Sequence, residues 1–424
     1  MLTVRFIREN KEKVKANISY KGQDEKLAWV DDLLQLDEQW RKDKKSLDDL
    51  RHERNEVSES INKAKKAGKD AKALLAQAKE LPKTIKCLEE AADKAQQKIK
   101  EYLFGIPNIV HPDVPQGKDE TENVERKAWG EQKTGKVKNH VELAESLDVA
   151  DFDASALVAG NGFYYLKKDL ALLNQALIRF AVDFMVEKGY EYTEAPLMVR
   201  RNIIDGVMSF KEMDDMIYKV EGEDLYLIGT SEHSLIGQFI DQTLRKEDLP
   251  IKLASYSVCF RKEIGSHGIN EKGLWRTHQF NKVEQVIICT PEQSWELFDE
   301  LLANAEDICQ ALGLPYRVAE MCTGDLGDLK ARQYDVEVWR PTIEDYGEIM
   351  SCSNLTAAQA TRLNIKYVDK KGDRDYCHTL NNTALATSRI MVGILENFQQ
   401  PDGSVIIPEA LRQHMGRKER ITPT

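Results

Sequence analysis

Apolar side chains in the first hundred residues recur at alternating steps of three and four positions, which is the spacing of a coiled-coil seam. One seam, interrupted by two polar members, runs through Leu33, Leu36, Trp40, Asp43, Leu47, Leu50, Arg54, Val57, Ile61 and Ala64. A second seam runs through Leu74, Ala78, Leu81, Ile85, Leu88, Ala92, Ala95, Ile99 and Tyr102. Between them, Ala67-Gly68-Lys69-Asp70 supplies a helix stop and a new start. The pattern predicts an arm over about residues 27–103, an antiparallel hairpin of two helices that are each on the order of 50 to 60 Å long.

The pattern changes after the arm. Three prolines, Pro107, Pro112 and Pro115, begin an irregular polar connection. From residue 139 onward helical and strand-like stretches alternate, and several later strands follow one another without an intervening helix, which favours an antiparallel sheet. We therefore expect an N-terminal domain at residues 1–108, a linker and the start of the core at 109–138, and a larger α+β domain at 139–424.

Individual elements of the larger domain follow from the same patterns. A helix is predicted over Leu170–Lys188, and a helical pattern opens at Asn381 and continues to about Phe398. Strands are predicted at Tyr190–Pro196, Leu225–Ile228, Ala254–Phe260 and Gln279–Cys289. The last two are joined by a polar, glycine-containing loop, Ile264–Trp275, so side chains beside this loop project from paired strands.

From the composition, a soluble, cytoplasmic protein is the default expectation. No stretch approaches the roughly twenty apolar residues of a membrane span, and the seven cysteines are scattered without a C-x-x-C pair. The net charge of -11 still permits a local basic patch for a nucleic acid. Such a patch lies around the turn of the arm and is formed by Lys63, Lys65, Lys66, Lys69 and Lys72. It can contact a phosphate backbone, although most coiled coils are dimerisation or spacer devices.

Candidate chemistry lies on both sides of the predicted strand pair. Arg261 and Glu263 precede the loop, and they are compatible with either a site or a structural ion pair. Glu348 and Ser351 have a spacing that lets two oxygens face one metal or phosphate. Arg389 lies on an otherwise apolar element, and its charge there needs an anion as a partner. No Walker loop and no G-x-G-x-x-G is present, so a nucleotide would not be bound by a glycine-rich loop.

These motifs resemble those of the class II aminoacyl-tRNA synthetases. Motif 2 of that class, F-R-x-E, a variable loop and R/H-x-x-x-F, is matched by Phe260-Arg261-Lys262-Glu263 and Arg276-Thr277-His278-Gln279-Phe280. Motif 1 resembles Leu170–Pro196, and motif 3 resembles Leu380–Phe398 with Arg389. Within the class the chain is similar to the seryl-tRNA synthetase family over essentially its whole length, including Thr230-Ser231-Glu232 and Tyr334–Trp339. The resemblance implies an antiparallel class II catalytic core with an N-terminal coiled-coil arm.

The resemblance also implies an activity and its residues. Serine and ATP would form seryl-adenylate, and the serine would then pass to the 3′ end of tRNA(Ser), with Arg261 and Arg389 as the catalytic residues on the phosphates. The implied ATP site comprises Arg261, Lys262, Glu263, Phe280, Glu348, Ile349, Met350, Ser351 and Arg389, with Mg²⁺ on Glu348 and Ser351. The implied serine site comprises Thr230, Ser231, Glu232, Glu284 and Thr383. For Glu284 an alternative stays open, a structural pairing with Lys282 or Arg276.

Partners follow from the same resemblance. The family's arm grips tRNA, which gives the lysines around the turn a role, and motif 1 forms a homodimer interface, whereas neither DNA nor a membrane is expected. The loop Gly268–Gly273 departs from the family's usual sequence and carries Ile269 and Asn270. Two alternatives to an active synthetase of this family are a catalytically inactive paralogue that acts as an RNA-binding or regulatory protein, and a ligase that charges a carrier protein.

Overall fold

The computed structural model describes residues 1–209, 213, 215–264 and 272–423. The chain divides into two compact units, Leu2–Pro107 and a larger one that comprises Met1 and Asn108–Thr424. Within the described ranges no helix is both long and apolar enough to cross a bilayer.

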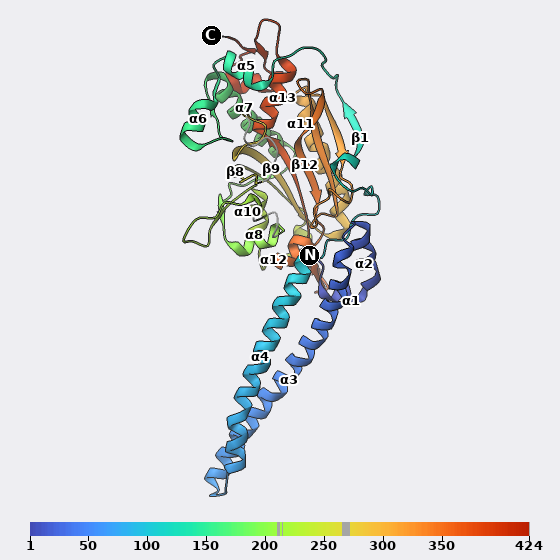
Figure 1. Cartoon of the computed structure of the whole chain (residues 1–424), viewed down its shortest axis with the longest axis vertical. Coiled ribbons are helices and arrows are strands. Elements are labelled where there is room, and N and C mark those ends of the chain that lie inside the picture. The colour runs from blue at the N-terminus through green and yellow to red at the C-terminus, as the bar shows by residue number, and fades with distance from the viewer. Residues whose placement is uncertain (210–212, 214, 265–271, 424) are drawn as a thin grey trace. The chain divides into compact units, whose positions relative to one another are not determined.

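The smaller unit is helical, and two long antiparallel helices lie side by side in it (Figure 1). Its helices are α1 (Val4–Glu9), α2 (Lys11–Tyr20), the short η1 (Asp24–Lys26), α3 (Leu27–Lys66) and α4 (Lys72–Gly105). The turn between α3 and α4 contains Gly68 at a φ of 66°, a conformation that glycine adopts without strain. The predicted hairpin is thereby confirmed.

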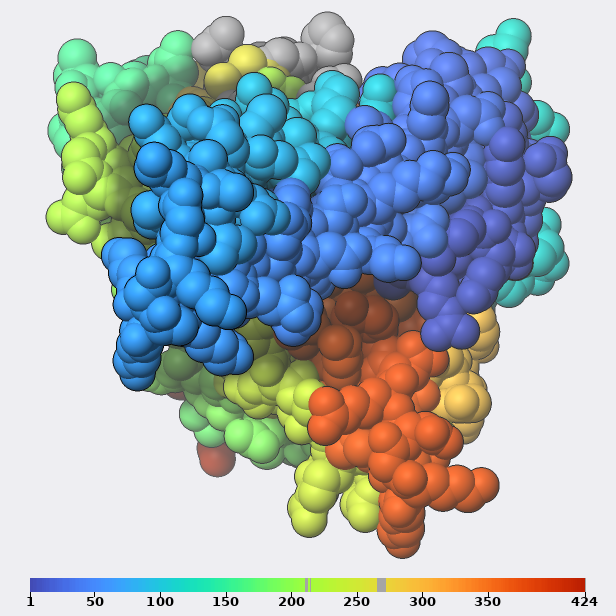
Figure 2. Space-filling view, turned by 90° about the horizontal axis from the view of Figure 1, so that it is seen from below, coloured from blue at the N-terminus to red at the C-terminus, as the bar shows by residue number. Residues whose placement is uncertain are grey.

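The seam between α3 and α4 buries the apolar positions that the heptad spacing indicated. One cluster packs Leu47 against Ile85 and Ala92, and a second packs Val57 and Ile61 against Leu81. The lysines near the turn, Lys63, Lys65, Lys66, Lys69 and Lys72, are all exposed. Figure 2 views the helical unit from the end that carries this turn. The turn therefore presents its positive charges to solvent, while the apolar seam holds the two helices together.

The larger unit is built on one twisted sheet, and among the described residues this sheet has eight strands. In spatial order they are β1 (Val124–Trp129), β10 (Tyr316–Glu320), β11 (Arg332–Arg340), β12 (Asp345–Asn354), β15 (His378–Ala386), β9 (Gln279–Cys289), β8 (Ile251–Phe260) and β4 (Glu191–Tyr192). Every neighbouring pair is antiparallel except β4 with β8. The predicted antiparallel sheet, and the pairing of the two strands that flank the loop, are confirmed.

Helices and small sheets surround this sheet (Figure 1). The helices are α5 (His140–Ser146), α6 (Phe152–Ala159), α7 (Lys168–Glu187), α8 (Arg201–Val207), α10 (Glu232–Gly237), α11 (Ser294–Ala311), α12 (Ala358–Leu363), α13 (Thr387–Phe398) and α14 (Glu409–Arg412), with short turns η2 (Glu120–Glu122), η3 (Lys246–Asp248), η4 (Pro291–Gln293) and η5 (Gln413–Met415). Three minor sheets are two-stranded and pair β2 (Ala150–Asp151) with β3 (Tyr165–Leu166), β5 (Met198–Val199) with β6 (Tyr226–Leu227), and β16 (Val405–Ile406) with β17 (Arg420–Ile421). In a fourth, the central strand β13 (Lys366–Val368) pairs with both β7 (Thr243–Arg245) and β14 (Arg374–Tyr376).

The two faces of the large sheet have different environments, as β9 illustrates. Its odd-numbered residues Val283 and Ile287 belong to the main core, to which α7, α11 and α13 contribute. The even-numbered Val286 and Ile288 belong to a second core with side chains of α8, α10 and α12. Successive side chains of a strand point to opposite faces, so Phe280, Lys282 and Glu284 share the face of the second core. That face carries the cavities described below.

One expected element begins later in the chain than its pattern indicated. The helical pattern was expected to open at Asn381, but residues 378–386 form strand β15 and the helix α13 begins at Thr387. The small and polar residues of β15 are paired on both sides, with β12 and with β9. Asn382 is fully buried and donates to the Leu301 carbonyl on α11. Long-range pairing has overridden the local helical pattern here.

Candidate active site

Two adjoining cavities open on this face of the sheet. The larger has a volume of about 330 Å³, and the smaller about 50 Å³. They share a wall made of Arg261, Lys282, Glu348 and Thr383. The larger cavity also contacts Thr230, Glu232, Glu284 and Ser351, and the smaller one contacts Glu263, Phe280, Ile349 and Arg389. The structure thus gathers most of the candidate serine residues at one cavity and most of the candidate ATP residues at the other.

Two β-bulges make this arrangement possible. Residues 348 and 351 are an odd number of positions apart, and in a regular strand they would point to opposite faces. The pairing of β12 with β11 contains an extra residue, because Met350 lies opposite Val336 and Glu348 opposite Glu337. The bulge at Ile349 therefore brings Glu348 to the face of Ser351. A similar bulge in β15 gives Thr383 and Ala386 a common face, and both line the smaller cavity.

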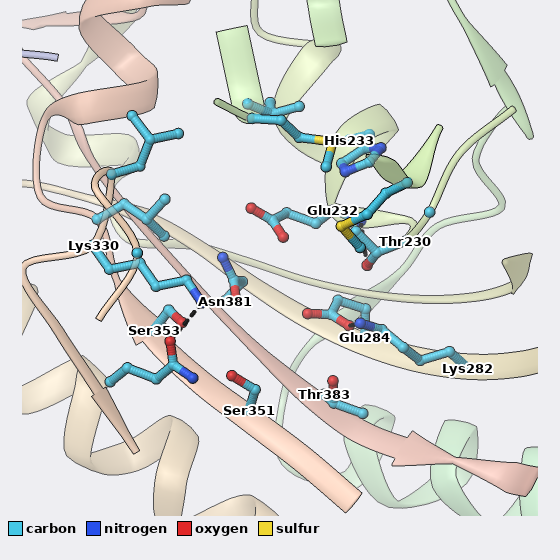
Figure 3. A pocket seen from close by; sticks show the side chains of 18 of the residues that line it. Thr230, Glu232, His233, Lys282, Glu284, Lys330, Ser351, Ser353, Asn381 and Thr383 are labelled. Atoms are coloured by element: carbon cyan, nitrogen blue, oxygen red, sulfur yellow. Dashed lines mark hydrogen bonds and ion pairs between the residues drawn. The ribbon is translucent and has the colours of Figure 1, made fainter. Parts of the chain in front are cut away.

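Glu232 begins α10 and directs its carboxylate into the larger cavity (Figure 3). Gln359 donates a hydrogen bond of 2.7 Å to this carboxylate. Burial, and then the negative charge of Glu284, raise the pKa of Glu232 to about 7. A half-buried carboxylate in that state is stabilised by any cation that enters the cavity.

Glu284 forms an ion pair with Lys282, at 2.5 Å between Nζ and Oε2, and both side chains are almost fully buried. The structural pairing with Lys282 that the sequence left open is therefore present. It does not remove Glu284 from the cavity, since both partners line it and Thr383 lies opposite Glu284 in the pairing of β9 with β15. Figure 3 shows Lys282, Glu284 and Thr383 on neighbouring strands of the cavity floor. The other proposed structural partner, Arg276, binds Glu263 instead, at 3.0 Å.

Three arginines border the smaller cavity, and two of them, Arg261 and Arg389, are held by backbone carbonyls. The Nε of Arg261 donates to the Gly229 carbonyl at 3.1 Å, and its guanidinium carbon lies 5.2 Å from the centre of the Phe280 ring. Arg389 donates to the Glu348 carbonyl at 2.7 Å and pairs with the Glu348 carboxylate at 3.1 Å. Burial acts to raise the pKa of Glu348, but the charges of Arg389 and then Arg261 hold it below its ordinary value. Two fixed cations and an ionised carboxylate suit a polyphosphate with a counter-ion.

A divalent cation would be compatible with this donor set. The carboxylate of Glu348 and the hydroxyl of Ser351 line one cavity, and Asp335 lies opposite Ser351 in the strand pairing. These are hard oxygen donors, and a magnesium ion needs only one or two of them from the protein because substrate phosphates and water complete its shell. Within the described residues no group of three or more histidine, cysteine or acidic side chains is arranged to hold a metal by itself.

Three of the predicted site residues line neither cavity. The hydroxyl of Ser231 is buried and donates to the Ser255 carbonyl. The side chain of Met350 is almost fully buried in the main core on the opposite face of β12. Lys262 donates its backbone N–H to the Met216 carbonyl, and its side chain is not among those that line the cavities.

Other cavity residues were not anticipated from the sequence, namely His233, Lys330, Gln333, Asp335, Ser353 and Asn381. Lys330 donates to Gln333, which donates to Asp335 at 2.7 Å. Burial and the charge of Glu348 raise the pKa of Asp335. His233 follows directly after the Thr-Ser-Glu triplet, and burial lowers its pKa to about 3, so it is a neutral imidazole. For Asp335 a signal existed, because it stands two positions before Glu337 in an alternating strand pattern.

Two family models match parts of the chain, and a full-length relative agrees with them. The model described as the seryl-tRNA synthetase N-terminal domain matches residues 1–110, and the model described as the tRNA synthetase class II core domain (G, H, P, S and T) matches residues 217–398. A relative from Methanocella arvoryzae named "Serine--tRNA ligase" is 50% identical and covers 99% of this chain and 100% of its own length. The chain belongs to the seryl-tRNA synthetase family.

Other members of the seryl-tRNA synthetase family agree over the full length. A serine–tRNA ligase from Pyrococcus furiosus is 46% identical, with 99% of this chain and 98% of the relative covered. The crystal structure of seryl-tRNA synthetase from Pyrococcus horikoshii complexed with ATP matches with a TM-score of 0.92 and 44% identity over 100% of both chains. The class II core with a helical N-terminal region is therefore confirmed. The divergent loop at Gly268–Gly273 lies largely outside the described residues.

Proposed function

We propose that the protein is an active seryl-tRNA synthetase, which joins L-serine to ATP as seryl-adenylate and transfers the serine to the 3′ end of tRNA(Ser). One observation carries the proposal: the cavity that contains the carboxylate of Glu232 adjoins the cavity bordered by Arg261 and Arg389, and Arg261, Lys282, Glu348 and Thr383 line both. A carboxylate and a phosphate that occupied the two cavities would meet at this shared wall. The full-length relatives named as serine–tRNA ligases favour this function over an inactive paralogue.

The phosphates of ATP would lie between the two arginines. Arg261 would receive the α-phosphate, whose negative charge grows as the serine carboxylate attacks, and Arg389 would hold the γ-phosphate so that pyrophosphate leaves in line. Both guanidinium groups are already fixed by backbone carbonyls, so little reorganisation is needed during the reaction. Phe280, with Glu263 nearby in the same cavity, would receive the adenine. A magnesium ion on Glu348 and Ser351 would supply counter-charge to the phosphates.

Serine would be recognised by polar groups that are costly to leave unpaired. The carboxylate of Glu232 and the hydroxyl of Thr230 would bind the α-ammonium group, and Glu284 with Thr383 would bind the side-chain hydroxyl. A site that hydrogen-bonds a hydroxyl rejects the analogue without it by roughly 10⁴-fold or more. Alanine is excluded in this way, while threonine is excluded by the volume of the cavity.

The helical unit would bind tRNA(Ser) through its exposed turn lysines by release of counter-ions from the phosphate backbone. We also propose a homodimer through the region of α6 and α7. Apolar side chains there remain exposed in the single chain, with Leu157 at 90%, Val158 at 72% and Leu172 at 49%. Isolated exposed apolar residues are common, and the proposal rests on three of them in the consecutive helices α6 and α7. A cytoplasmic location fits a protein whose products are used in translation.

Serine-dependent exchange of pyrophosphate into ATP tests the activation step with pure protein, serine and magnesium. We expect exchange with serine and a loss of at least several hundredfold with alanine. Aminoacylation of tRNA(Ser) tests the transfer step separately. The proposal is refuted if the pure protein with serine and magnesium shows no exchange of pyrophosphate into ATP.

A further inference from the structure

The segment just before β9 is fixed by a buried network outside the residues assigned to substrates. The ring of His140 accepts the backbone N–H of Leu274 on Nε2 at 3.2 Å, so its proton lies on Nδ1, which faces Glu396 at 3.2 Å. Glu396, on α13, is fully buried and also accepts a bond of 3.0 Å from Arg340. Burial acts to raise the pKa of Glu396, but its bonds with His140 and Arg340 hold it below the ordinary value. An ionised carboxylate thus ties α5, β11 and α13 to the segment at Leu274.

Trp275 follows Leu274 and borders the smaller cavity. The guanidinium carbon of Arg340 lies 4.2 Å from the centre of its ring, and that of Arg389 lies 5.5 Å away. Gly347 packs so closely against the indole that a Cβ atom at this position would overlap Cζ2 and Cη2. The ring is therefore confined between strand β12 and two cations.

The main chain of Trp275 makes a further contact with Arg389. Its carbonyl oxygen accepts from Nε of Arg389 at 3.3 Å, while Nη1 of Arg389 donates to the Glu348 carbonyl. Arg389 is thus held on two sides, by β12 and by the segment that leads into β9. A guanidinium group has five N–H donors in a rigid plane, so two backbone contacts set the direction in which the remaining donors point.

We infer that Trp275 is a positioning residue for Arg389, and that its ring and carbonyl aim the guanidinium group at the polyphosphate of ATP. The His140–Glu396–Arg340 network holds Trp275 in place for this purpose. The inference rests on the proposed function, since it assigns Arg389 to ATP. It predicts a role in ATP use and none in serine binding, because Trp275 lines only the cavity that holds Arg389 and Phe280.

The test compares Trp275→Leu with Trp275→Phe in the full-length protein. Serine-dependent pyrophosphate exchange is measured with ATP varied and then with serine varied. Trp275→Leu removes the π face, and kcat/KM for ATP is expected to fall about tenfold, a factor in the upper range for a partly desolvated cation–π contact. The KM for serine is expected to change by less than about twofold. Trp275→Phe keeps an aromatic face and is expected to restore most of the activity with ATP.

A second variant perturbs the ring without altering it. Gly347→Ala places a methyl group where the indole lies, so it is expected to reproduce the loss in kcat/KM for ATP while Trp275 is present. In a Trp275→Leu background the methyl group has room, and Gly347→Ala is expected to add little. Such non-additivity is the signature of two residues that act through one contact.

The outcomes separate the two proposals. Absence of exchange in the wild-type protein refutes the proposed function itself. Exchange in the wild type, with an unchanged kcat/KM for ATP in both Trp275→Leu and Gly347→Ala, overturns the inference on Trp275. An equal loss for ATP and serine, without rescue by Trp275→Phe, also overturns it, because that pattern indicates a general structural role.

Discussion

Glu232, the carboxylate proposed to bind the ammonium group of serine, is expected to destabilise the folded protein. Its pKa is raised to about 7 from an ordinary value of 4.5, first by burial and then by Glu284. Between these two pH values the folded protein holds a proton that the unfolded chain has released, so stability falls as the pH rises from about 4.5 to about 7. At 1.36 kcal/mol per pH unit the full cost above pH 7 is about 3 kcal/mol. Because the residue is only partly buried, a cost of about 1 to 3 kcal/mol is expected.

The Glu232→Gln variant tests this cost. Its amide oxygen can still accept the bond from Gln359, so the substitution removes the charge and keeps the contact. We expect the variant to be about 1 to 3 kcal/mol more stable than the wild type at pH 8, and nearly equal to it at pH 5, where Glu232 is already protonated. The measurement is urea unfolding of the ligand-free protein followed by tryptophan fluorescence, since four of the six tryptophans lie in the larger unit.

The same variant must lose serine binding if the charge has the proposed role. Removing a charged partner of a hydrogen bond costs about 1.5 to 3 kcal/mol, or about 10- to 150-fold in kcat/KM for serine. In the wild type, KM for serine should rise as the pH falls below about 7, because protonated Glu232 no longer offers a negative charge to the ammonium group. The reasoning is refuted if Glu232→Gln is no more stable than the wild type at pH 8, or if its advantage is the same at pH 5.

Three other predictions concern other parts of the molecule. Replacing the five exposed turn lysines with alanine should weaken tRNA(Ser) binding and lower the slope of log Kd against log salt by about 0.7 to 0.9 per lost phosphate contact. Serine-dependent pyrophosphate exchange should be unchanged. A filter-binding titration in increasing salt measures the slope, and loss of both tRNA binding and exchange would contradict the prediction. Leu172→Glu on α7 should shift a dimer towards monomer in sedimentation velocity, with Leu75→Glu on the helical unit as an equally exposed control. Glu284→Gln should lower the preference for serine over alanine at least tenfold in the exchange assay, and it should also destabilise the fold by about 3 to 5 kcal/mol because Lys282 is left buried without its partner.

The fold was predictable wherever a local period decided it. The heptad spacing correctly predicted the helical arm, since Leu47, Val57 and Ile61 are buried at the predicted positions. The polar loop between two apolar runs correctly predicted the pairing of β8 with β9. In each case the side chains that determine the element lie within one stretch of the chain, so the period of 3.5 or 2 is visible without knowledge of the partner.

The candidate site was predictable only where motif residues themselves reach the cavities. Arg261, Glu284 and Arg389 were found in this way. The chain from Lys330 through Gln333 to Asp335 was not, because its hydrogen bonds are local but its place beside Ser351 and Ser353 depends on the pairing of β11 with β12. Trp275 was assigned to the loop, yet its contacts come from Arg340, Gly347 and Arg389, three positions that lie more than sixty residues away in sequence.

The bulges show most clearly why local reasoning ends where it does. The spacing of Glu348 and Ser351 suggested that both oxygens face one ligand, but in a regular strand that spacing places them on opposite faces. The shared face depends on the extra residue Ile349, which is set by how β12 pairs with β11. The same device in the neighbouring strand β15 aligns Thr383 with Ala386. Two adjacent strands therefore each shift their register beside the cavities, and the site is specified by strand pairing as much as by the identity of its residues.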